Sequence, residues 1–328
     1  MGAGDRGLGA RASAARPGFV LLPILLTGSV PVQFVDIRVH DPAMIAANGR
    51  YYLFATGRGI DVWSSTDLAN WTRKAPVFAT PPAWAAELVP GFVNHVWAPD
   101  ISYHDGRYHL YYSVSRFGKN RSAIGHATNI TLDPSDPDFR WTDHGPVVRS
   151  IPGRDRWNAI DPNLVLAHDG TPWLVFGSFW SGIKLVRLAP DLNTPARPET
   201  LHAVAARPND AIEAPFIFRK NGWYYLFVSW DVCCRGAAST YKVMVGRSRE
   251  IIGPYLDREG EDMRSGGGTL VVMGDSAWAG VGHSATYTFG KTDYLIFHGY
   301  ARFDEGRPKL LLREIKWDEE GWPRVALD

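Results

Sequence analysis

Three acidic residues stand in closely similar surroundings along the chain. Asp41 lies in HDPAM, Asp161 in IDPNL and Glu213 in IEAPF, each eight or nine residues before the glycine of a predicted tight turn. A single acid at such a place is normally a solvated strand end. Three carboxylates in one register predict a shared site for general acid and base chemistry.

Two further segments carry other side chains at the same step from a turn. The step lands on Trp97 in VWAPD, and the corresponding step in the fifth repeat, counted from Lys291, lands on His283 in GHSAT. Four of the five positions are therefore polar or ionisable, and the fifth offers an aromatic ring. If the five segments meet in space, their side chains face a single point.

The residue types favour glycoside hydrolysis, because carboxylates and aromatic rings occur without a phosphate loop, a GxSxG motif or a nucleotide fingerprint. That reaction needs one carboxylic acid that stays protonated and one carboxylate that activates water. A third carboxylate nearby raises the proton affinity of its neighbours by repulsion. The 13 Trp could stack on sugars, although a core merely rich in rings has the same composition.

The elements that must position these residues repeat five times. Each repeat is a polar or glycine turn followed by a run of Tyr, Leu, Phe and Val, the pattern of a strand that leaves a tight hairpin. The five segments are GRYYLFATG (49–57), GRYHLYYSVS (106–115), GTPWLVFGSF (170–179), NGWYYLFVSW (221–230) and KTDYLIFHGY (291–300).

The spacing of these repeats, roughly fifty to seventy residues, is what a four-stranded propeller blade with variable loops occupies. Further short strand candidates lie at 60–67, 183–190 and 241–248, and no segment has sustained helical periodicity. We therefore predict an all-β fold, a five-bladed β-propeller. A two-sheet sandwich or jelly roll is the alternative, but it gives no reason for one hairpin to recur five times. In a propeller the inner strands start around one mouth of the central channel, where the acids would meet.

The first thirty residues differ from the rest. An arginine-containing stretch, MGAGDRGLGARASAARPG, precedes the short apolar run GFVLLPILLTGSV. This order is typical of a secretory signal peptide, so we expect a protein secreted to the extracellular space or the periplasm. A disordered extension from an upstream start codon is the alternative. We place the catalytic propeller at 31–328.

Charge and hydropathy exclude several classes of partner. The 35 Lys and Arg nearly balance the 34 Asp and Glu, so no strong field would recruit nucleic acid or an anionic membrane. No segment beyond the N-terminal run approaches the length of a membrane span. We expect a neutral partner, a polysaccharide, and a monomeric protein.

The two cysteines, Cys233 and Cys234, are neighbours in the sequence. Adjacent Cα atoms lie about 3.8 Å apart, closer than in an ordinary disulfide, so only a vicinal ring could join them. Two buried free thiols are equally consistent with the sequence. Neither a disulfide framework nor a cysteine zinc site can be built from this pair.

Several motifs in this order resemble one enzyme family. They are HDP (40–42), NAIDP (158–162), GSFWSGI (177–183), IEAPF (212–216), CCRG (233–236) and GHSAT (282–286). The set resembles the arabinan endo-1,5-α-L-arabinosidases, in the family 43 type of glycoside hydrolases, five-bladed propellers that also include β-xylosidases and α-L-arabinofuranosidases. The resemblance runs from about Val35 to the C-terminus. HDP alone is a weak signal, whereas NAIDP with SFWSG and CCRG is specific.

The resemblance implies a role for each acid. Asp41 would be the general base on water, Glu213 the general acid, and Asp161 the carboxylate that orients the site and raises the pKa of the acid. The family inverts the anomeric centre, which predicts a separation of roughly 6.5–9.5 Å between the base and acid carboxyl groups.

The resemblance also implies contacts to the substrate and to a metal. His283 resembles the residue that faces an ion, usually Ca²⁺, on the channel axis, where waters would complete the oxygen shell. The alternative for His283 is a hydrogen bond to a catalytic acid. The substrate-contacting residues would be Asp41, Trp97, Gly118, Asn158, Ala159, Ile160, Asp161, Ser178, Phe179 and Trp180.

Three functions are compatible with these observations. The first is an endo-acting arabinanase, which SFWSG and CCRG favour. The second is an exo-acting β-xylosidase or α-L-arabinofuranosidase on the same scaffold, which would need a blocked pocket in place of an open groove. The third is a sugar-binding propeller without catalysis, which gains nothing from burying carboxylates that repel one another.

Overall fold

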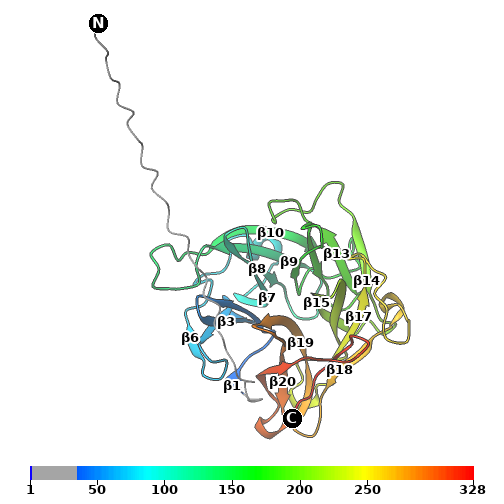
Figure 1. The fold of residues 1–328 in the computed structure, drawn as a ribbon. Helices are drawn as coiled ribbons and strands as arrows, with labels where there is room; N and C mark the ends of the chain where they lie inside the picture. Colours follow the sequence, from blue (N-terminus) through cyan, green and yellow to red (C-terminus); the bar gives the residue numbers. More distant parts are fainter. Residues whose placement is uncertain (2–34) are drawn as a thin grey trace.

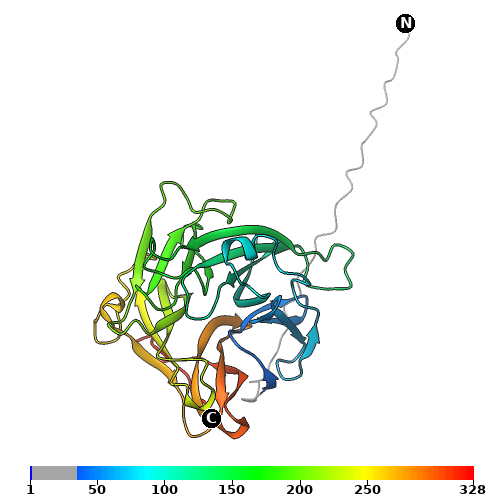
Figure 2. The ribbon, with the colours of Figure 1, turned by 180° about the vertical axis from the view of Figure 1, so that it is seen from behind.

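Five antiparallel sheets lie around a common axis, as two opposite views show (Figure 1, Figure 2). The structure is a computed structural model, and it describes residues 35–328 together with Met1. The predicted five-bladed β-propeller is confirmed. The segment predicted to be a signal peptide lies outside the described residues.

The chain builds the blades in sequence order, each from its inner to its outer strand. Blade 1 contains β2 (Ala43–Ala47), β3 (Arg50–Ala55), β5 (Asp61–Ser65) and β6 (Thr72–Lys74). Blade 2 contains β7 (His95–His104), β8 (Arg107–Val114), β9 (Ser122–Asn129) and β10 (Thr142–Ser150), with β4 (Gly57–Arg58) beside β7. Blade 3 contains β11 (Asn163–Leu166), β12 (Pro172–Phe176), β13 (Ile183–Arg187) and β14 (Leu201–Ala205). Blade 4 contains β15 (Ile212–Lys220), β16 (Trp223–Trp230), β17 (Lys242–Ser248) and β18 (Thr269–Met273).

Blade 5 joins the two ends of the described chain. Its inner strands are β19 (Trp278–Phe289), β20 (Thr292–Ala301) and β21 (Arg307–Glu314), and its outer strand is β1 (Val35–Arg38), which pairs antiparallel with β21. The ring is therefore closed by the first described strand. The remaining short elements are α1 (Ala85–Leu88), η1 (Gly236–Ala238), η2 (Met263–Ser265), η3 (Arg302–Asp304), β22 (Lys316–Trp317) and β23 (Pro323–Arg324).

The five repeated segments form the second strand of each blade, and their composition follows from their position. Alternate side chains of a strand point to opposite faces. In β3, Tyr52 and Phe54 pack against blade 2, whereas Tyr51 and Leu53 pack against blade 5. Because both faces are covered, the strand is apolar at almost every position. Five clusters of buried apolar residues fill the five interfaces between neighbouring blades in this way.

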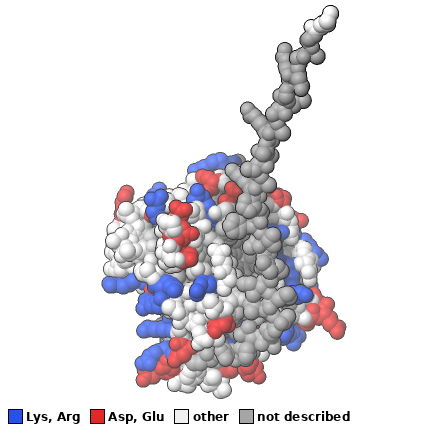
Figure 3. Space-filling model, turned by 60° about the vertical axis from the view of Figure 1, so that its left-hand side comes forward, with Lys and Arg blue, Asp and Glu red and all other residues white. Residues whose placement is uncertain are grey.

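The surface carries both signs of charge. Basic and acidic side chains are interspersed over the described part of the face in Figure 3, as the near-equal numbers of Lys plus Arg and Asp plus Glu predict. Among the described residues, no helix has the length and apolar character needed to cross a membrane.

Candidate active site

The inner strand of each blade begins after, or bends at, a residue in the left-handed backbone region. The φ angles are 52° at Asp41, 45° at Ala98, 59° at Asp161, 53° at Ala214 and 51° at His283. Such a conformation costs a non-glycine residue roughly 1–3 kcal/mol and persists only where the surroundings enforce it. The same conformation recurs at this end of the channel in all five blades, and backbone strain of this kind is typical of functional sites.

Side chains from neighbouring blades hold these five backbone N–H groups. Thr56 accepts from Ala98, and Ser113 and Ser229 accept from the residues at the same step of blades 3 and 5, at 2.8–3.0 Å. These three hydroxyl residues each follow a turn glycine by seven positions. His298 Nδ1 accepts from Asp41, and Asp161 Oδ2 accepts from Ala214, both at 3.1 Å. The ring of contacts fixes all five strand starts around one mouth.

The predicted register is one residue out in two blades. The residues equivalent to Asp41, Asp161 and His283 are Ala98 and Ala214, so Trp97 and Glu213 stand one position earlier. Ala98 and Ala214 lie eight residues before their turn glycines, as Asp41 does, whereas Trp97 and Glu213 lie nine residues before them. The pairing of β7, β15 and β19 is irregular at this point, where an extra residue forms a bulge.

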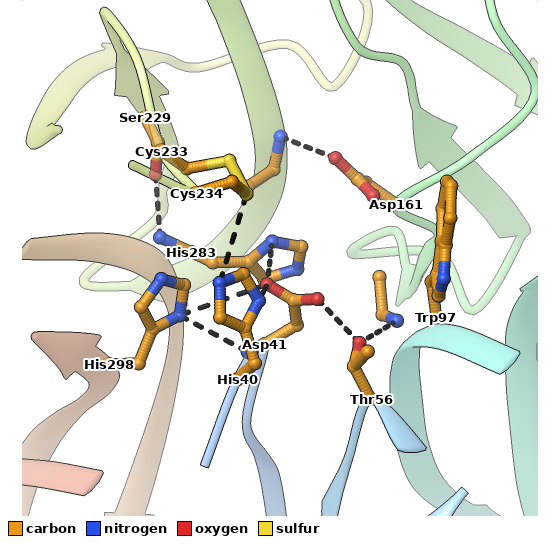
Figure 4. A network of polar contacts seen from close by, with 12 residues as sticks. His40, Asp41, Thr56, Trp97, Asp161, Ser229, Cys233, Cys234, His283 and His298 are labelled. Atoms are coloured by element: carbon orange, nitrogen blue, oxygen red, sulfur yellow. Dashed lines mark hydrogen bonds and ion pairs between the residues drawn. A yellow bond between two sulfur atoms is a disulfide. The ribbon is translucent and has the colours of Figure 1, made fainter. Parts of the chain in front are cut away.

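The structure brings the three predicted acids together. Asp161 accepts a hydrogen bond from the N–H next to Glu213, and the charges of Asp41 and Glu213 both act on its carboxyl group. All three are buried, with 6–9% of each residue exposed. Figure 4 shows Asp41, Asp161 and the Trp97 ring facing the same space. Acids more than 50 residues apart in sequence therefore form one site.

Asp41 lies in a shell of hydrogen-bond donors. Its Oδ1 is 2.8 Å from His40 Nδ1 and 3.0 Å from His283 Nδ1, and its Oδ2 accepts from the Thr56 hydroxyl at 2.5 Å (Figure 4). Burial alone would raise the pKa of Asp41. The charge of His283 and the hydrogen bonds from His283 and His40 outweigh burial and hold this pKa well below its usual value, so the carboxylate is ionised.

The pKa values of Glu213 and Asp161 are shifted upward, in the direction opposite to that of Asp41. Burial raises the pKa of Glu213, and the hydroxyls of Ser178 (2.7 Å) and Tyr241 (2.8 Å), which donate to its two oxygens, oppose that rise only in part. Burial, followed by repulsion from Glu213 and Asp41 against attraction by His283, raises the pKa of Asp161 to about 8. The site can thus hold a proton on the Glu213 side while Asp41 stays charged.

His283 forms a hydrogen bond with the carboxylate of Asp41, which was the alternative to its role beside a metal ion. Burial lowers its pKa, but Asp41 and Asp161 raise it to about 9, so the ring is protonated. Its Nδ1 faces Asp41, and Nε2 is the ring nitrogen left to face an ion, which would have to displace a proton. One nitrogen is a poor match for the oxygen shell of calcium unless waters supply the rest. The calcium prediction stays a prediction.

One other group of side chains has the spacing of metal ligands. Among the described residues, His40, Asp41 and His298 alone place their ligand atoms within 4.8 Å of one another. Their ring nitrogens are already engaged, because His40 lies between Asp41 and Tyr300, and His298 accepts from Asp41 N–H and faces Tyr300 at 3.2 Å. We assign no metal to this group.

The predicted substrate-contacting residues occupy different situations. Asn158 and Ala159 are buried and engaged, since Asn158 Oδ1 accepts from Ser122 and Ala159 N–H donates to Ser150. Ile160 is also buried, whereas Phe179 and Trp180 are half-buried with φ near +50°. Gly118 lies in an exposed turn with φ of 69°, which explains the glycine, and an added Cβ would meet nothing within 4 Å. Their contacts to a sugar remain predictions.

Cys233 and Cys234 are joined by a disulfide, so the vicinal ring, and not the pair of free thiols, is present. Cys234 N–H donates to Tyr300 Oη at 2.7 Å, and its Sγ lies 3.9 Å from His40 Nε2. The disulfide therefore stands beside the shell of Asp41 (Figure 4).

Sequence reasoning missed the second layer of the site. The missed residues are His40, Thr56, Tyr241, His298 and Tyr300. Thr56 could have been found, because it shares its seven-residue offset from a turn glycine with Ser113 and Ser229. The others have no such periodic signal.

Comparison with known proteins places this arrangement in a family. The sequence profile of Glycosyl hydrolases family 43 matches residues 32–323. The chain belongs to glycosyl hydrolase family 43. It is 47% identical over 312 residues to an extracellular exo-α-(1→5)-L-arabinofuranosidase of Cellvibrio japonicus, covering 92% of this chain and 90% of that protein. It is 45% identical to an extracellular endo-α-(1→5)-L-arabinanase of Bacillus subtilis, covering 87% of each.

A solved structure of similar sequence has the same fold as this family 43 member. The Cellvibrio cellulosa α-L-arabinanase, in complex with arabinohexaose, is 48% identical, with a TM-score of 0.86 over 88% of this chain and 96% of that one. The propeller of this chain is therefore a glycosidase scaffold.

Proposed function

We propose that this family 43 enzyme hydrolyses the α-1,5-linked L-arabinofuranosyl backbone of arabinan with inversion. One observation carries the proposal: two buried carboxyl groups in one site have pKa shifts of opposite sign. The environment thus favours the ionised form of one carboxyl group and the protonated form of the other, as the base and the acid of this reaction require.

The roles follow from these environments. Asp41 takes a proton from the attacking water, and Glu213 gives a proton to the oxygen of the leaving sugar. Asp161 accepts a hydrogen bond from the Ala214 N–H, next to Glu213, and its carboxyl group would orient that part of the site. Trp97 supplies a ring beside the acids (Figure 4).

The relatives support the choice of substrate and compartment. Those described above are named as an α-(1→5)-L-arabinofuranosidase or as arabinanases, and two of them are named extracellular. We therefore propose a secreted enzyme that acts on arabinan and arabino-oligosaccharides as a monomer.

The mode of cleavage has two candidates. We propose endo cleavage, because SFWSG (178–182) and CCRG (233–236) resemble endo-arabinanases and the Bacillus relative is an endo enzyme. Exo cleavage is the second candidate, since the Cellvibrio relative with 47% identity is named an exo enzyme. A non-catalytic lectin would have no use for the opposed carboxyl groups.

Digestion of debranched arabinan tests the proposal. Short oligosaccharides with a rapid fall in viscosity would indicate endo cleavage, single arabinose units exo cleavage, and no new reducing ends would refute hydrolysis. Proton NMR of the first product should show the inverted anomer. Glu213→Ala should lose cleavage and keep binding, with partial recovery on substrates whose leaving groups need less protonation. Asp169→Asn, a change of an exposed acid, serves as the control.

We also propose that a Ca²⁺ ion can lie next to His283, held by its Nε2 and by water. Calcium would supply positive charge on the channel axis. Chelator treatment followed by titration with Ca²⁺, monitored by calorimetry and thermal unfolding, tests this. Equal unfolding temperatures with and without Ca²⁺, and no heat of binding, would refute it.

A further inference from the structure

The position of Asp41 depends on a chain of hydrogen bonds that begins outside the acids. Tyr300, on β20 in blade 5, is 2% exposed, and its hydroxyl contacts four groups. They are His40 Nε2 at 2.7 Å, His298 Nε2 at 3.2 Å, Cys234 N–H at 2.7 Å and the Ser239 side chain. His40 in turn contacts Asp41, so the Tyr300 hydroxyl is two hydrogen bonds from the base.

Two backbone N–H groups fix the direction of every bond in this chain, because an N–H can only donate. Asp41 N–H donates to His298 Nδ1, so the proton of the neutral His298 ring is on Nε2 and points to the Tyr300 oxygen. Cys234 N–H donates to the same oxygen. The Ser239 hydroxyl, whose hydrogen bond lowers the pKa of Tyr300, acts on that oxygen as a donor and itself accepts from Arg235 N–H. His40 Nε2 is then the partner left to accept the proton of Tyr300.

These bond directions determine which nitrogen of His40 carries its proton. Since its Nε2 accepts, its proton is on Nδ1, which faces Asp41 Oδ1 at 2.8 Å. The ring is also held in place by stacking on His298, with centroids 4.0 Å apart. A partner on one imidazole nitrogen sets the tautomer at the other. The base thus receives a donor whose direction is set by blade 5 and by the loop that contains Cys234.

The disulfide gives a reason for the CCRG motif. A bond between neighbouring cysteines closes a small ring that includes the peptide bond between them, and the N–H of that peptide is the one that donates to Tyr300. The disulfide ring therefore holds the Cys234 N–H in place, and this N–H in turn orients the Tyr300 hydroxyl. Cys234 is exposed at the surface, where a reductant can reach it.

We propose that Tyr300, together with the Cys233–Cys234 disulfide, positions the general base: Tyr300 holds His40 as the donor to Asp41, and the disulfide holds Tyr300. The proposal rests on the assignment of Asp41 as base. Tyr300, His40 and the disulfide are positioning groups, and none needs to touch the sugar. A small displacement of a reacting group can lower the reaction rate by a large factor, so hydrogen bonds that only hold the base in position can still matter for catalysis.

Tyr300→Phe keeps the ring and removes the hydroxyl. We expect kcat on linear arabino-oligosaccharides to fall roughly fivefold to tenfold, as loss of one net hydrogen bond in the transition state implies, with KM within about twofold. In a His40→Ala background the same change should have no further effect on kcat, because the path to Asp41 is already broken. A purely structural role would lower both backgrounds alike.

The disulfide is tested in the same way. Cys233→Ser with Cys234→Ser should lower kcat without a comparable change in KM, and should add nothing to Tyr300→Phe. Dithiothreitol offers a second measurement on the unchanged sequence: it gives two electrons and two protons to the S–S bond, becomes its own cyclic disulfide, and leaves two thiols. It should lower kcat, and reoxidation should restore it.

Tyr111→Phe is the matched control, since its buried hydroxyl donates to Leu192 O in blade 3, away from the acids. It should cost stability and leave kcat unchanged. Wild-type kcat in Tyr300→Phe, or an equal loss with and without His40, would overturn the role of Tyr300. Wild-type kcat after removal of both cysteines would overturn the role of the disulfide. No hydrolysis by the wild-type enzyme would instead overturn the proposed function.

Discussion

Removal of the Tyr241 hydroxyl should extend activity toward alkaline pH. Tyr241 is fully buried and donates to Glu213 Oε1 at 2.8 Å, and burial, followed by the charges of nearby acids, raises its own pKa well above the usual value. It is therefore a neutral donor throughout the working range. A donor to a carboxylate stabilises the ionised form, so the hydroxyl lowers the pKa of Glu213.

The sign and size of the effect follow from this contact. Glu213 acts in its protonated form, so activity is lost as pH rises through its pKa. Tyr241→Phe removes a hydrogen bond to a charged group, worth roughly 1.5–3 kcal/mol, of which Ser178 can recover part. Since about 1.4 kcal/mol corresponds to a tenfold change in proton affinity, the alkaline limb should move up by about one pH unit.

The assay is kcat/KM on a linear arabino-oligosaccharide as a function of pH, because this ratio reports the free enzyme. Glu213 and Asp161 are close enough that the limb belongs to both acids together. Tyr255→Phe is the control, since its buried hydroxyl donates to Ile251 O. An alkaline limb that stays in place, moves down, or moves equally in the control would refute the reasoning.

Three further predictions concern the same end of the channel. Asp41→Asn should abolish hydrolysis and leave arabinohexaose binding measurable by calorimetry; full activity would exclude Asp41 as base. Gly282→Ala should lower both kcat and the unfolding temperature, because its Cβ would lie 2.3 Å from the Tyr241 ring. Ser229→Ala should cost roughly 1–3 kcal/mol in urea unfolding, because it leaves the His283 N–H without its acceptor; a cost near zero would contradict this.

The fold and the acids were predictable because their signals are local and periodic. A strand between two neighbours is apolar on both faces, so runs such as YYLF in β3 and β16 can be recognised without knowledge of the neighbours. Asp41, Asp161 and Glu213 were found as acids that stand eight or nine residues before a turn glycine. The bulges in β7, β15 and β19 were not predictable, because an extra residue in a strand leaves no periodic mark.

The second layer was not predictable, because it depends on which blades are neighbours. His298 contacts Asp41 across 257 positions and Tyr300 contacts His40 across 260. Nothing in the segment around residue 300 indicates that it will lie beside residue 40. That contact exists only because a propeller returns its last blade to its first.

The proposed base, Asp41, therefore lies at the seam of the ring, the junction between blade 5 and blade 1. The segment before Asp41 belongs to blade 5, since β1 pairs with β21, whereas the segment after it begins β2 of blade 1. Its donors His283 and His40 and its acceptor His298 either stand on blade 5 or are held by it. Until the seam closes, Asp41 lacks the charge that keeps it ionised in a buried place. Closure of the propeller and assembly of the base are accordingly the same structural event.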